Sequence, residues 1–376
     1  FYAKAASIAP DQAPPWLGLA NALRDLGRFE EADRAYKRSR LLDSAPLAAW
    51  NHSQLLIGLE RYHEAYALAE QRFHLSHFEP YRNGLSAEAW NGAVEPFGAL
   101  HLWGEQGFGD CLQYLRWCVP LSAMAAPVVL ELEQPLVELA RLGFGWLERP
   151  PDVLAQQASA PALDPQARHL SLLSAPHRVG QAPMQNLFNS TERPGYWHGY
   201  LRSPDWPMRM PGGRPRVGLV WAAGRKLDEP FAAREYRKRS LPADLLGVLI
   251  EGLKAQNADL VALQVGFDCD QAASWRDVIS DALPQHADFA LTAQWIRQLD
   301  LLISVDTAAA HLAGALGHPC WLLLPFSADP RWLRERNDTP WYPSLRLFRQ
   351  PATGQWEPVI DEVLELFSSW WRSAAG

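Results

Sequence analysis

The sequence has few cysteines, no excess of positive charge and no long apolar run. Its four cysteines show neither metal-ligand nor disulfide-framework spacing, which fits a reduced, cytoplasmic compartment: Cys111, Cys118, Cys269 and Cys320. A net charge of −7 argues against a general nucleic-acid binder, because such proteins present a basic surface. No apolar run reaches the roughly 18 residues that span a bilayer, so we expect no transmembrane segment.

Length and composition indicate a protein of several domains. With 376 residues, 48% of them hydrophobic, the chain can bury more than one core, and we expect two or three domains. The chain begins at Phe1 inside a helical pattern, without a methionine or a signal peptide. We therefore expect it to be a fragment of a longer protein.

Apolar and aromatic residues recur through the first 75 or so positions. Trp16 returns as Trp50 and Tyr2 as Tyr36, at a spacing of 34 residues. The pattern resembles tetratricopeptide repeats, whose helix pairs must stack on neighbours to bury their apolar faces. We expect about two and a half copies over residues 1–77, forming a binding or spacing surface without chemistry of its own. An unrelated helical bundle is the alternative.

From residue 97 onward, short apolar runs alternate with helical stretches, a pattern typical of α/β domains with parallel sheets. We expect two Rossmann-like domains, over residues 97–205 and 206–350, and a final helix within 351–376. Residues 149–168 are rich in Ala, Pro and Gln and predict a loop. A ligand would lie in the cleft between the two domains, at the carboxyl ends of the strands.

Residues 301–325 carry the clearest local pattern. They predict a buried strand, a helix that starts near Asp306 and Thr307, and a second strand over 320–324. A helix N-terminus at the carboxyl end of a strand has free N–H groups and a partial positive charge, so it favours a phosphate. Thr307 and His311 share one helix face. The alternative is an ordinary crossover, with Asp306 as the N-cap and His311 as a surface histidine.

A glycine-rich turn over residues 104–110 lies between a predicted strand and a predicted helix. It departs from the dinucleotide-binding fingerprint, and no acidic residue lies at the right distance to bind a ribose, so we exclude NAD. Asp110 stands at the start of the helix and faces the expected cleft. It could cap the helix or act as a general base.

Two further segments carry charge. The expected loop over residues 224–240 contains six basic residues, which could bind a diphosphate or form a solvated face: Arg225, Lys226, Arg234, Arg237, Lys238 and Arg239. Asp268-Cys269-Asp270 has the form of a metal-binding triplet. Because no further ligands lie nearby in the sequence, we expect a surface turn there, and neither a metal nor a cofactor.

Six segments then occur together in one order: EQGxGD (105–110), VGLVW (217–221), RxRSLP (237–242), DL…VDTA (300–308), HLAGALG (311–317) and WYPSxRLFRQ (341–350). As a set they resemble the bacterial tetratricopeptide-repeat glycosyltransferases, whose catalytic half is similar to the lipopolysaccharide heptosyltransferases of glycosyltransferase family 9. A more distant similarity is to the protein O-linked N-acetylglucosamine transferases. The resemblance implies a GT-B fold and an inverting, metal-independent transfer from a nucleotide sugar.

The resemblance also implies roles for residues at matching positions. Asp110 corresponds to the proposed general base, and His311 supports the phosphate-binding helix start, so both are candidate catalytic residues. The candidate donor-binding residues are Gly107, Gly109, Arg237, Arg239, Ser240, Asp306, Thr307 and Ala308.

The sequence leaves two questions open: which acceptor the protein uses, and whether it is an active enzyme. We expect a protein or glycan acceptor that reaches the cleft along the repeats, since tetratricopeptide grooves mostly bind peptides. The alternative is a non-catalytic scaffold with a degenerate nucleotide-binding module. Two departures from the family pattern motivate it: Glu235-Tyr236 stand where an acidic residue usually precedes the Arg-x-Arg-Ser segment, and Leu291 stands where an aspartate is usual.

Overall fold

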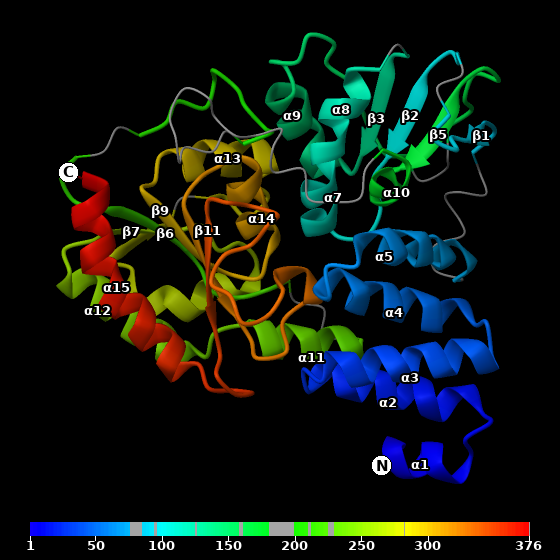
Figure 1. The fold of residues 1–376 in the computed structure, drawn as a ribbon. Coiled ribbons are helices and arrows are strands. Elements are labelled where there is room, and N and C mark those ends of the chain that lie inside the picture. Colours follow the sequence, from blue (N-terminus) through cyan, green and yellow to red (C-terminus); the bar gives the residue numbers. More distant parts are fainter. Residues whose placement is uncertain are drawn as a thin grey trace.

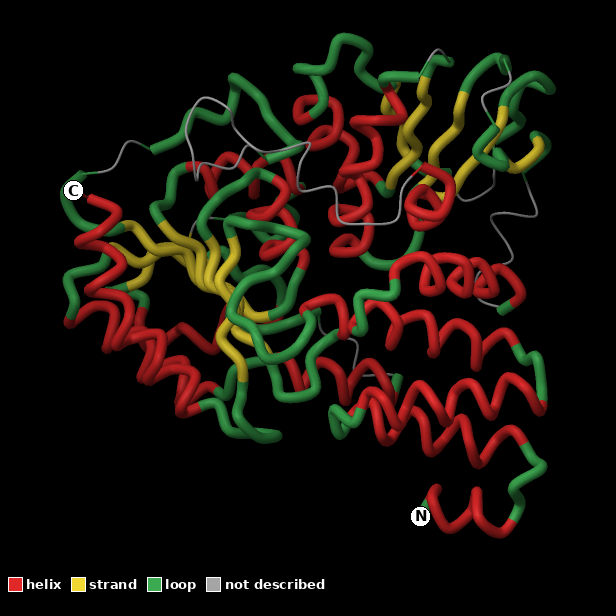
Figure 2. The backbone as a smooth tube through the Cα atoms, viewed as in Figure 1, coloured by secondary structure: helices red, strands yellow, loops and turns green. Residues whose placement is uncertain are grey.

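The computed structural model describes residues 1–75, 85–93, 96–124, 126–157, 161–179, 199–209, 212–224, 229–281 and 283–375. A row of helices comes first, and two parallel sheets with flanking helices follow (Figure 1). Figure 2 shows the strands gathered in two separate groups. The protein is therefore a mixed α/β protein, and two parallel sheets in tandem match the expected GT-B type of architecture.

The helical segment consists of hairpins that stack side by side (Figure 1). Its helices are α1 (Tyr2–Ile8), α2 (Ala13–Asp25), α3 (Phe29–Leu42), α4 (Pro46–Gly58) and α5 (Tyr62–Ala69), followed by the 3-10 helix η1 (Glu70–His74). Helices α2 and α4 begin 33 residues apart, and both carry a proline in the first turn, where a missing N–H costs no hydrogen bond. The pair α4–α5 thus repeats the pair α2–α3.

The first sheet has the strand order β1-β5-β2-β3-β4, and all its pairs are parallel. Its strands are β1 (Glu88–Ala89), β2 (Leu100–Trp103), β3 (Val128–Leu132), β4 (Asp152–Ala155) and β5 (Arg168–Ser171). The helices of this part are α7 (Phe108–Tyr114), α8 (Cys118–Ser122), α9 (Gln134–Gly143) and α10 (Ala175–Val179), with the short 3-10 helices η2 (Leu115–Trp117) and η3 (Leu172–Ser174).

The second sheet has the order β11-β10-β9-β6-β7-β8 and is also parallel. Its strands are β6 (Arg216–Val220), β7 (Asp259–Ala262), β8 (Ile279–Asp281), β9 (Leu301–Val305), β10 (Cys320–Leu324) and β11 (Leu345–Arg349). Its helices are α11 (Pro230–Arg239), α12 (Ala243–Ala255), α13 (Phe289–Arg297), α14 (Ala308–Ala315) and α15 (Glu357–Ala375), with the 3-10 helices η5 (Phe267–Trp275) and η6 (Pro330–Trp332). Every residue of β9 and β10 is buried, as expected for central strands with helices on both faces.

Several local predictions are confirmed. The strand–helix–strand unit over 301–325 forms as β9, α14 and β10, and the final amphipathic helix forms as α15. Three were wrong. The N-cap of α14 is Thr307 and not Asp306. The expected loop over 149–168 contains β4 and the first residue of β5, and the expected basic loop ends in the helix α11.

The helical segment packs against both sheet-containing parts. Leu56, Ile57 and Tyr66 belong to one apolar cluster with buried residues of both α/β units. Helix α4 contacts η6, and a side chain at Gly58 would meet Pro330 at 2.9 Å. The helical segment is therefore supported by both α/β units and not by the first one alone.

Within the described residues, the structure has no helix with the length and apolar character that crossing a membrane would require.

Candidate functional site

Two short helices from different sheets meet at the candidate site. Helix α7 follows β2, helix α14 follows β9, and the two helices pack against each other. Gly109 permits this close approach, because a Cβ there would lie only 2.9 Å from Cδ2 of His311. The packing brings the glycine-rich turn and the expected phosphate-binding helix start to one place.

Asp110 lies in the first turn of α7 with its side chain 26% exposed. Its Oδ1 accepts a hydrogen bond of 2.7 Å from Nη2 of Arg331. Its Oδ2 accepts only a long contact of 3.4 Å from the N–H of Gly107, which caps the helix weakly. A carboxylate oxygen offers about two lone pairs, so Oδ2 can accept a further hydrogen bond.

Arg331 joins the two α/β units at this point. It lies in η6, after the second sheet's β10, and donates Nη1 to Oε1 of Gln113 on α7 at 2.8 Å. It also pairs with Asp329 at 3.0 Å. Burial alone would raise the pKa of Asp329, but the charge and hydrogen bonds of Arg331 lower it to about 2. Asp110, Asp329 and Arg331 therefore form one charged cluster across the two units.

Asp306 and Arg239 extend this cluster toward the N-terminus of α14. Nη1 of Arg239 donates to the backbone oxygen of Asp306 at 3.2 Å. Burial raises the pKa of the Asp306 carboxyl, and the positive charge of Arg239 partly opposes that effect. Thr307 forms a hydroxyl contact of 3.0 Å with Ser304, and Ala308 follows it as the first residue of α14.

His311 is buried and not a surface residue. Its Nδ1 lies 2.9 Å from the hydroxyl of Tyr342, and its Nε2 lies 3.9 Å from Oδ1 of Asp306. Burial, together with the nearby charge of Arg331, holds the pKa of His311 well below its ordinary value. The imidazole is therefore neutral at physiological pH, and of these two contacts only the one with Tyr342 is within hydrogen-bonding distance.

A cavity of about 230 Å³ opens beside Asp110. Its walls come from four parts of the chain: the helical segment, the turn and helix at residues 106–114, Leu173 of η3, and the segment with Asp329 and Arg331. The helical segment contributes Trp50, Gln54, Ile57, Tyr66, Ala69 and Arg72. Asp110 thus lines a cavity to which the helical segment also contributes a wall.

The structure does not gather all the predicted basic residues at this site. Arg237 donates Nε to the oxygen of Ala233 within its own helix, and Lys238 pairs with Glu235 at 2.7 Å. Ser240 accepts a hydrogen bond from the N–H of Ala223, which fixes the end of α11 beside the end of β6. Arg225 and Lys226 lie outside the described residues.

The Asp268-Cys269-Asp270 triplet reaches the surface at Asp270, as expected, but it forms part of a 3-10 helix and not a turn. It lies in η5, where Asp268 is buried and accepts hydrogen bonds from the hydroxyl of Tyr236 and from Nε2 of Gln271. In the described ranges of the chain, no group of three or more His, Cys, Asp or Glu side chains is placed to bind a metal ion.

Sequence reasoning missed Asp329, Arg331 and Trp332, whose ring lies 5.1 Å from the ring of His311. One signal could have found them. They follow β10 closely, and the carboxyl ends of parallel strands meet at one edge of a sheet. Asp329 and Arg331, which come after the apolar strand β10, were therefore candidate site residues for the same reason as Asp306 after β9.

No protein-family model matches the chain. A relative, protein FlbA of Caulobacter vibrioides, is 24% identical over 399 residues, and the alignment covers 96% of this chain and 62% of FlbA. The chain thus spans less than two thirds of the length of that relative.

Solved structures with a similar course of the chain include ADP-heptose lipopolysaccharide heptosyltransferase II of E. coli, with 11% identity and a TM-score of 0.45 over 74% of this chain and all of that one. The iron-containing heptosyltransferase TibC of E. coli, in complex with an ADP-heptose, shows 14% identity and a TM-score of 0.46 over 74% of this chain and 77% of TibC. An O-GlcNAc transferase of Thermobaculum terrenum aligns over all of this chain and 82% of its own, with 13% identity and a TM-score of 0.29. At TM-scores below 0.5 these similarities carry no argument about chemistry, which depends on the residues of the site.

Proposed function

We propose that the protein is a metal-independent, inverting glycosyltransferase that moves a sugar from a nucleotide-sugar donor to a hydroxyl of a protein or glycan acceptor. One observation carries the proposal: helix α7 of the first α/β unit packs against α14 of the second, and a cavity lies beside Asp110 of α7. The ordered segments that resemble the repeat-bearing glycosyltransferases support it, and so does the order of repeats followed by two parallel sheets.

The chemistry follows from the positions of the charged groups. Oδ2 of Asp110 accepts the proton of the acceptor hydroxyl, whose oxygen forms a bond to the anomeric carbon. The bond from that carbon to the diphosphate breaks on the opposite face, and the nucleoside diphosphate leaves with the electron pair. The free N–H groups at Thr307 and Ala308 and the guanidinium of Arg239 stabilise its negative charge.

The cavity beside Asp110 is the proposed route for the acceptor. Because α4 and α5 form one of its walls, a side chain or glycan that lies along the helical segment can bring a hydroxyl to Asp110. In this proposal the segment with two and a half tetratricopeptide-like repeats selects the acceptor, and the unit that contains the second sheet binds the donor.

The test replaces Asp110 with Asn, which keeps the shape of the side chain but cannot take up the proton. We expect turnover to fall by about 10²–10⁴-fold, the usual contribution of a general base, while donor affinity changes little. Calorimetry with UDP-, GDP- and ADP-sugars measures donor binding, and release of the nucleotide measures transfer or hydrolysis.

Asp244→Asn is the matched control, because Asp244 is an exposed acidic residue in the first turn of another helix, α12. It should keep full activity. Full turnover by Asp110→Asn would remove Asp110 from the mechanism. The assays are repeated with EDTA, and a loss of activity that Mn²⁺ or Mg²⁺ restores would contradict the metal-independent mechanism.

A non-catalytic scaffold is the second candidate. The ion pair between Asp110 and Arg331 favours it, since the guanidinium occupies one of the two carboxylate oxygens that a general base would use. The scaffold predicts that no nucleotide sugar binds at millimolar concentration. Binding of a nucleotide sugar together with its slow hydrolysis would support the glycosyltransferase and contradict the scaffold.

A further inference from the structure

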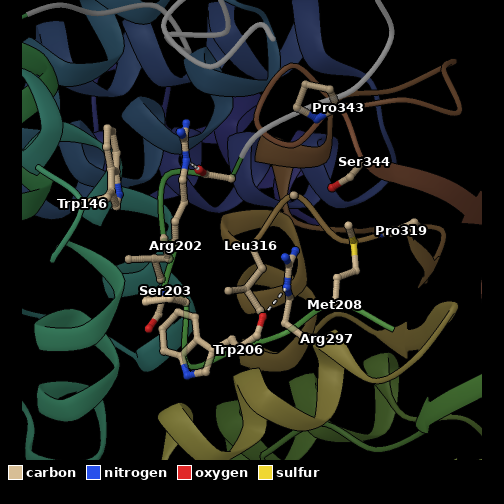
Figure 3. Close-up of a pocket in the computed structure, with 14 residues that line it drawn as sticks. Trp146, Arg202, Ser203, Trp206, Met208, Arg297, Leu316, Pro319, Pro343 and Ser344 are labelled. Carbon is tan, nitrogen blue, oxygen red and sulfur yellow. Dashed lines mark hydrogen bonds between the residues drawn. The ribbon is translucent and has the colours of Figure 1, made fainter. Parts of the chain in front are cut away.

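A second, larger cavity lies away from the charged cluster. It has a volume of about 490 Å³, within the usual range for sites that bind small molecules. Figure 3 shows the side chains around it: Trp146, Arg202 and Trp206 on one side, and Arg297, Pro319 and Ser344 on the other. The first group belongs to the first α/β unit and the segment after it, and the second group belongs to the second unit.

The position of this cavity separates it from the proposed donor site. Leu316 and Gly317 line it at the C-terminal end of α14, whereas Thr307 and Ala308 lie at the N-terminal end. Pro319 and Ser344 directly precede β10 and β11, so the cavity lies at the amino ends of these strands. A nucleotide in a parallel α/β sheet binds at the opposite, carboxyl edge.

The charges that line the cavity are of one sign. Among the described residues, the 14 that line it include two arginines and no acidic residue, in a chain whose net charge is −7. The guanidinium of Arg202 lies 4.3 Å from the ring centre of Trp146 and donates Nε to the oxygen of Gly199. Partial burial lowers the pKa of Arg202, and in the described part of the chain no carboxylate offsets this desolvation.

Two further polar groups at the cavity are buried without a hydrogen-bond partner among the described residues. They are Oγ of Ser344 and Nε1 of Trp206, whose side chain is only 2% exposed. Buried polar atoms are paired in the great majority of cases, so such atoms at a cavity indicate a missing partner. The hydroxyl of Ser344 points toward the space between the drawn side chains, and the guanidinium of Arg297 extends into the same region (Figure 3).

The remaining walls are apolar. Leu201, Leu316, Pro319 and Pro343 surround the polar groups, and the ring of Trp146 is 40% exposed. An exposed tryptophan beside prolines offers a flat surface for a ring. The site therefore combines donors for an anion with a surface for a planar apolar group.

From this combination we propose that the cavity binds a small organic anion, a molecule with one carboxylate or phosphate group on a flat apolar body. The anionic group is bound by Arg202 with Ser344, and the body lies against Trp146 and Leu316. The proposal does not depend on the glycosyltransferase function, because it uses none of the residues placed in that mechanism.

Fluorine NMR on the full chain tests the proposal with three matched probes: para-fluorobenzoate, para-fluorophenyl phosphate and the neutral para-fluorobenzamide. At least one anion should bind roughly tenfold more tightly than the amide, because only an anion can form a charge-assisted hydrogen bond with Arg202 in which both partners are charged. The stronger of the two anions identifies whether the ligand is a carboxylate or a phosphate. Equal binding of all three probes, or no binding at millimolar concentration, would overturn the proposal.

Substitutions in the cavity test whether the probes bind there. Arg202→Gln should remove the preference for the anion, and Trp146→Ala should weaken all three probes. Arg141→Gln is the control, since Arg141 is an exposed arginine of α9 paired with Glu138, and it should bind as the unaltered protein does. Melting temperatures show that each variant is folded. If Arg202→Gln and Trp146→Ala both bound as the control does, or if a nucleoside diphosphate displaced the probe, the cavity would not be the site.

Discussion

Two glycines in the turn before α7 have different physical roles. A Cβ on Gly109 would press on the buried ring of His311, whereas a Cβ on Gly107 would meet its nearest neighbour at 3.7 Å, an ordinary contact. Only Gly109 is therefore required by the packing of α7 on α14. The sequence motif alone, in which the two glycines look equivalent, does not reveal this difference.

Gly109→Ala should destabilise the protein by about 1–3 kcal/mol, the usual cost of overpacking. Gly107→Ala, the matched control, should change stability by less than about 1 kcal/mol. Chemical denaturation of both variants measures the difference. Equal stability of the two variants would show that α7 and α14 are not in close contact.

Arg331 is the residue on which the charged cluster depends. Its replacement leaves Asp110, Asp329 and Gln113 without their shared donor, so Arg331→Gln should cost about 1–3 kcal/mol of unfolding free energy. Arg336→Gln is the control, since Arg336 forms surface ion pairs with Glu60 and Asp338 that contribute at most about 1 kcal/mol. Denaturant melts at pH 7 compare the two, and a smaller effect at position 331 than at 336 would contradict the structural role of Arg331.

At the scale of elements, apolar patterns predicted some strands and not others. Strands β9 and β10 are fully buried, so their continuous apolar runs stand out in the sequence. Strand β4 alternates exposed and buried residues over only four positions, and prolines lie near it. Helix α11 has three basic residues in its last turn, where positive charges interact favourably with the helix dipole. In the sequence, the same charges led to the prediction of a loop.

The junction of α14 and β10 should make the protein sensitive to acid. His318 is 2% exposed, neither ring nitrogen has a hydrogen-bond partner among the described residues, and burial lowers its pKa to about 3. The unfolded chain takes up a proton near pH 6.5, whereas the folded chain does so only near pH 3. The stability contributed by the neutral ring is therefore complete above about pH 6.5 and is lost as the pH falls toward 3.

His318→Gln should flatten the pH dependence of the unfolding free energy between pH 6.5 and 4, by an amount that reaches several kcal/mol at the acid end. His286→Gln, at an exposed position, is the control and should retain the slope of the unaltered protein. Urea melts across this pH range measure both. A slope that the first substitution leaves unchanged would mean that His318 does not stay neutral in the folded chain.

For the whole molecule, the helical segment divides into two parts by its packing. Residues of α2 and α3 form a separate apolar cluster with Leu55, whereas Leu56, Ile57, Ala65 and Tyr66 belong to the core shared with both sheets. Arg72, fully buried, adds hydrogen bonds to Glu105, Ser171 and Ser174. Helices α4 and α5 are thus part of the α/β core, and only α1 to α3 form an outer layer.

Removal of residues 1–42 should leave a cooperatively folded protein with unchanged donor affinity and weaker use of the acceptor. Removal of residues 1–75 should abolish folding. Each large buried side chain contributes about 1.5–3 kcal/mol, so the loss of Leu56, Ile57 and Tyr66 approaches the 5–15 kcal/mol of a whole domain. Circular dichroism melts compare the two truncations, and a cooperative transition in the shorter chain would refute this division.

The candidate site could be predicted only in part. Asp306 follows β9 directly, and Asp110 and His311 lie in the helices that come after β2 and β9; such residues converge at one edge of a parallel sheet. Arg331 could have been assigned to that edge by the same rule, but its contact with Asp110 was not predictable, because the contact depends on how two sheets and a row of helices are arranged. Arg237 was predicted to bind the donor, but its side chain donates a hydrogen bond to a backbone oxygen of its own helix.

The contact between α4 and η6 also bears on how the chain is made. Helix α4 leaves the ribosome well before Pro330, against which Gly58 packs, because Pro330 lies 272 positions later in the chain than Gly58. At about 5–20 residues per second, the apolar face of α4 waits on the order of ten seconds or more for this partner. During that interval the nascent chain presents an unpaired apolar helix, so its yield in cells should depend on chaperones that bind such surfaces.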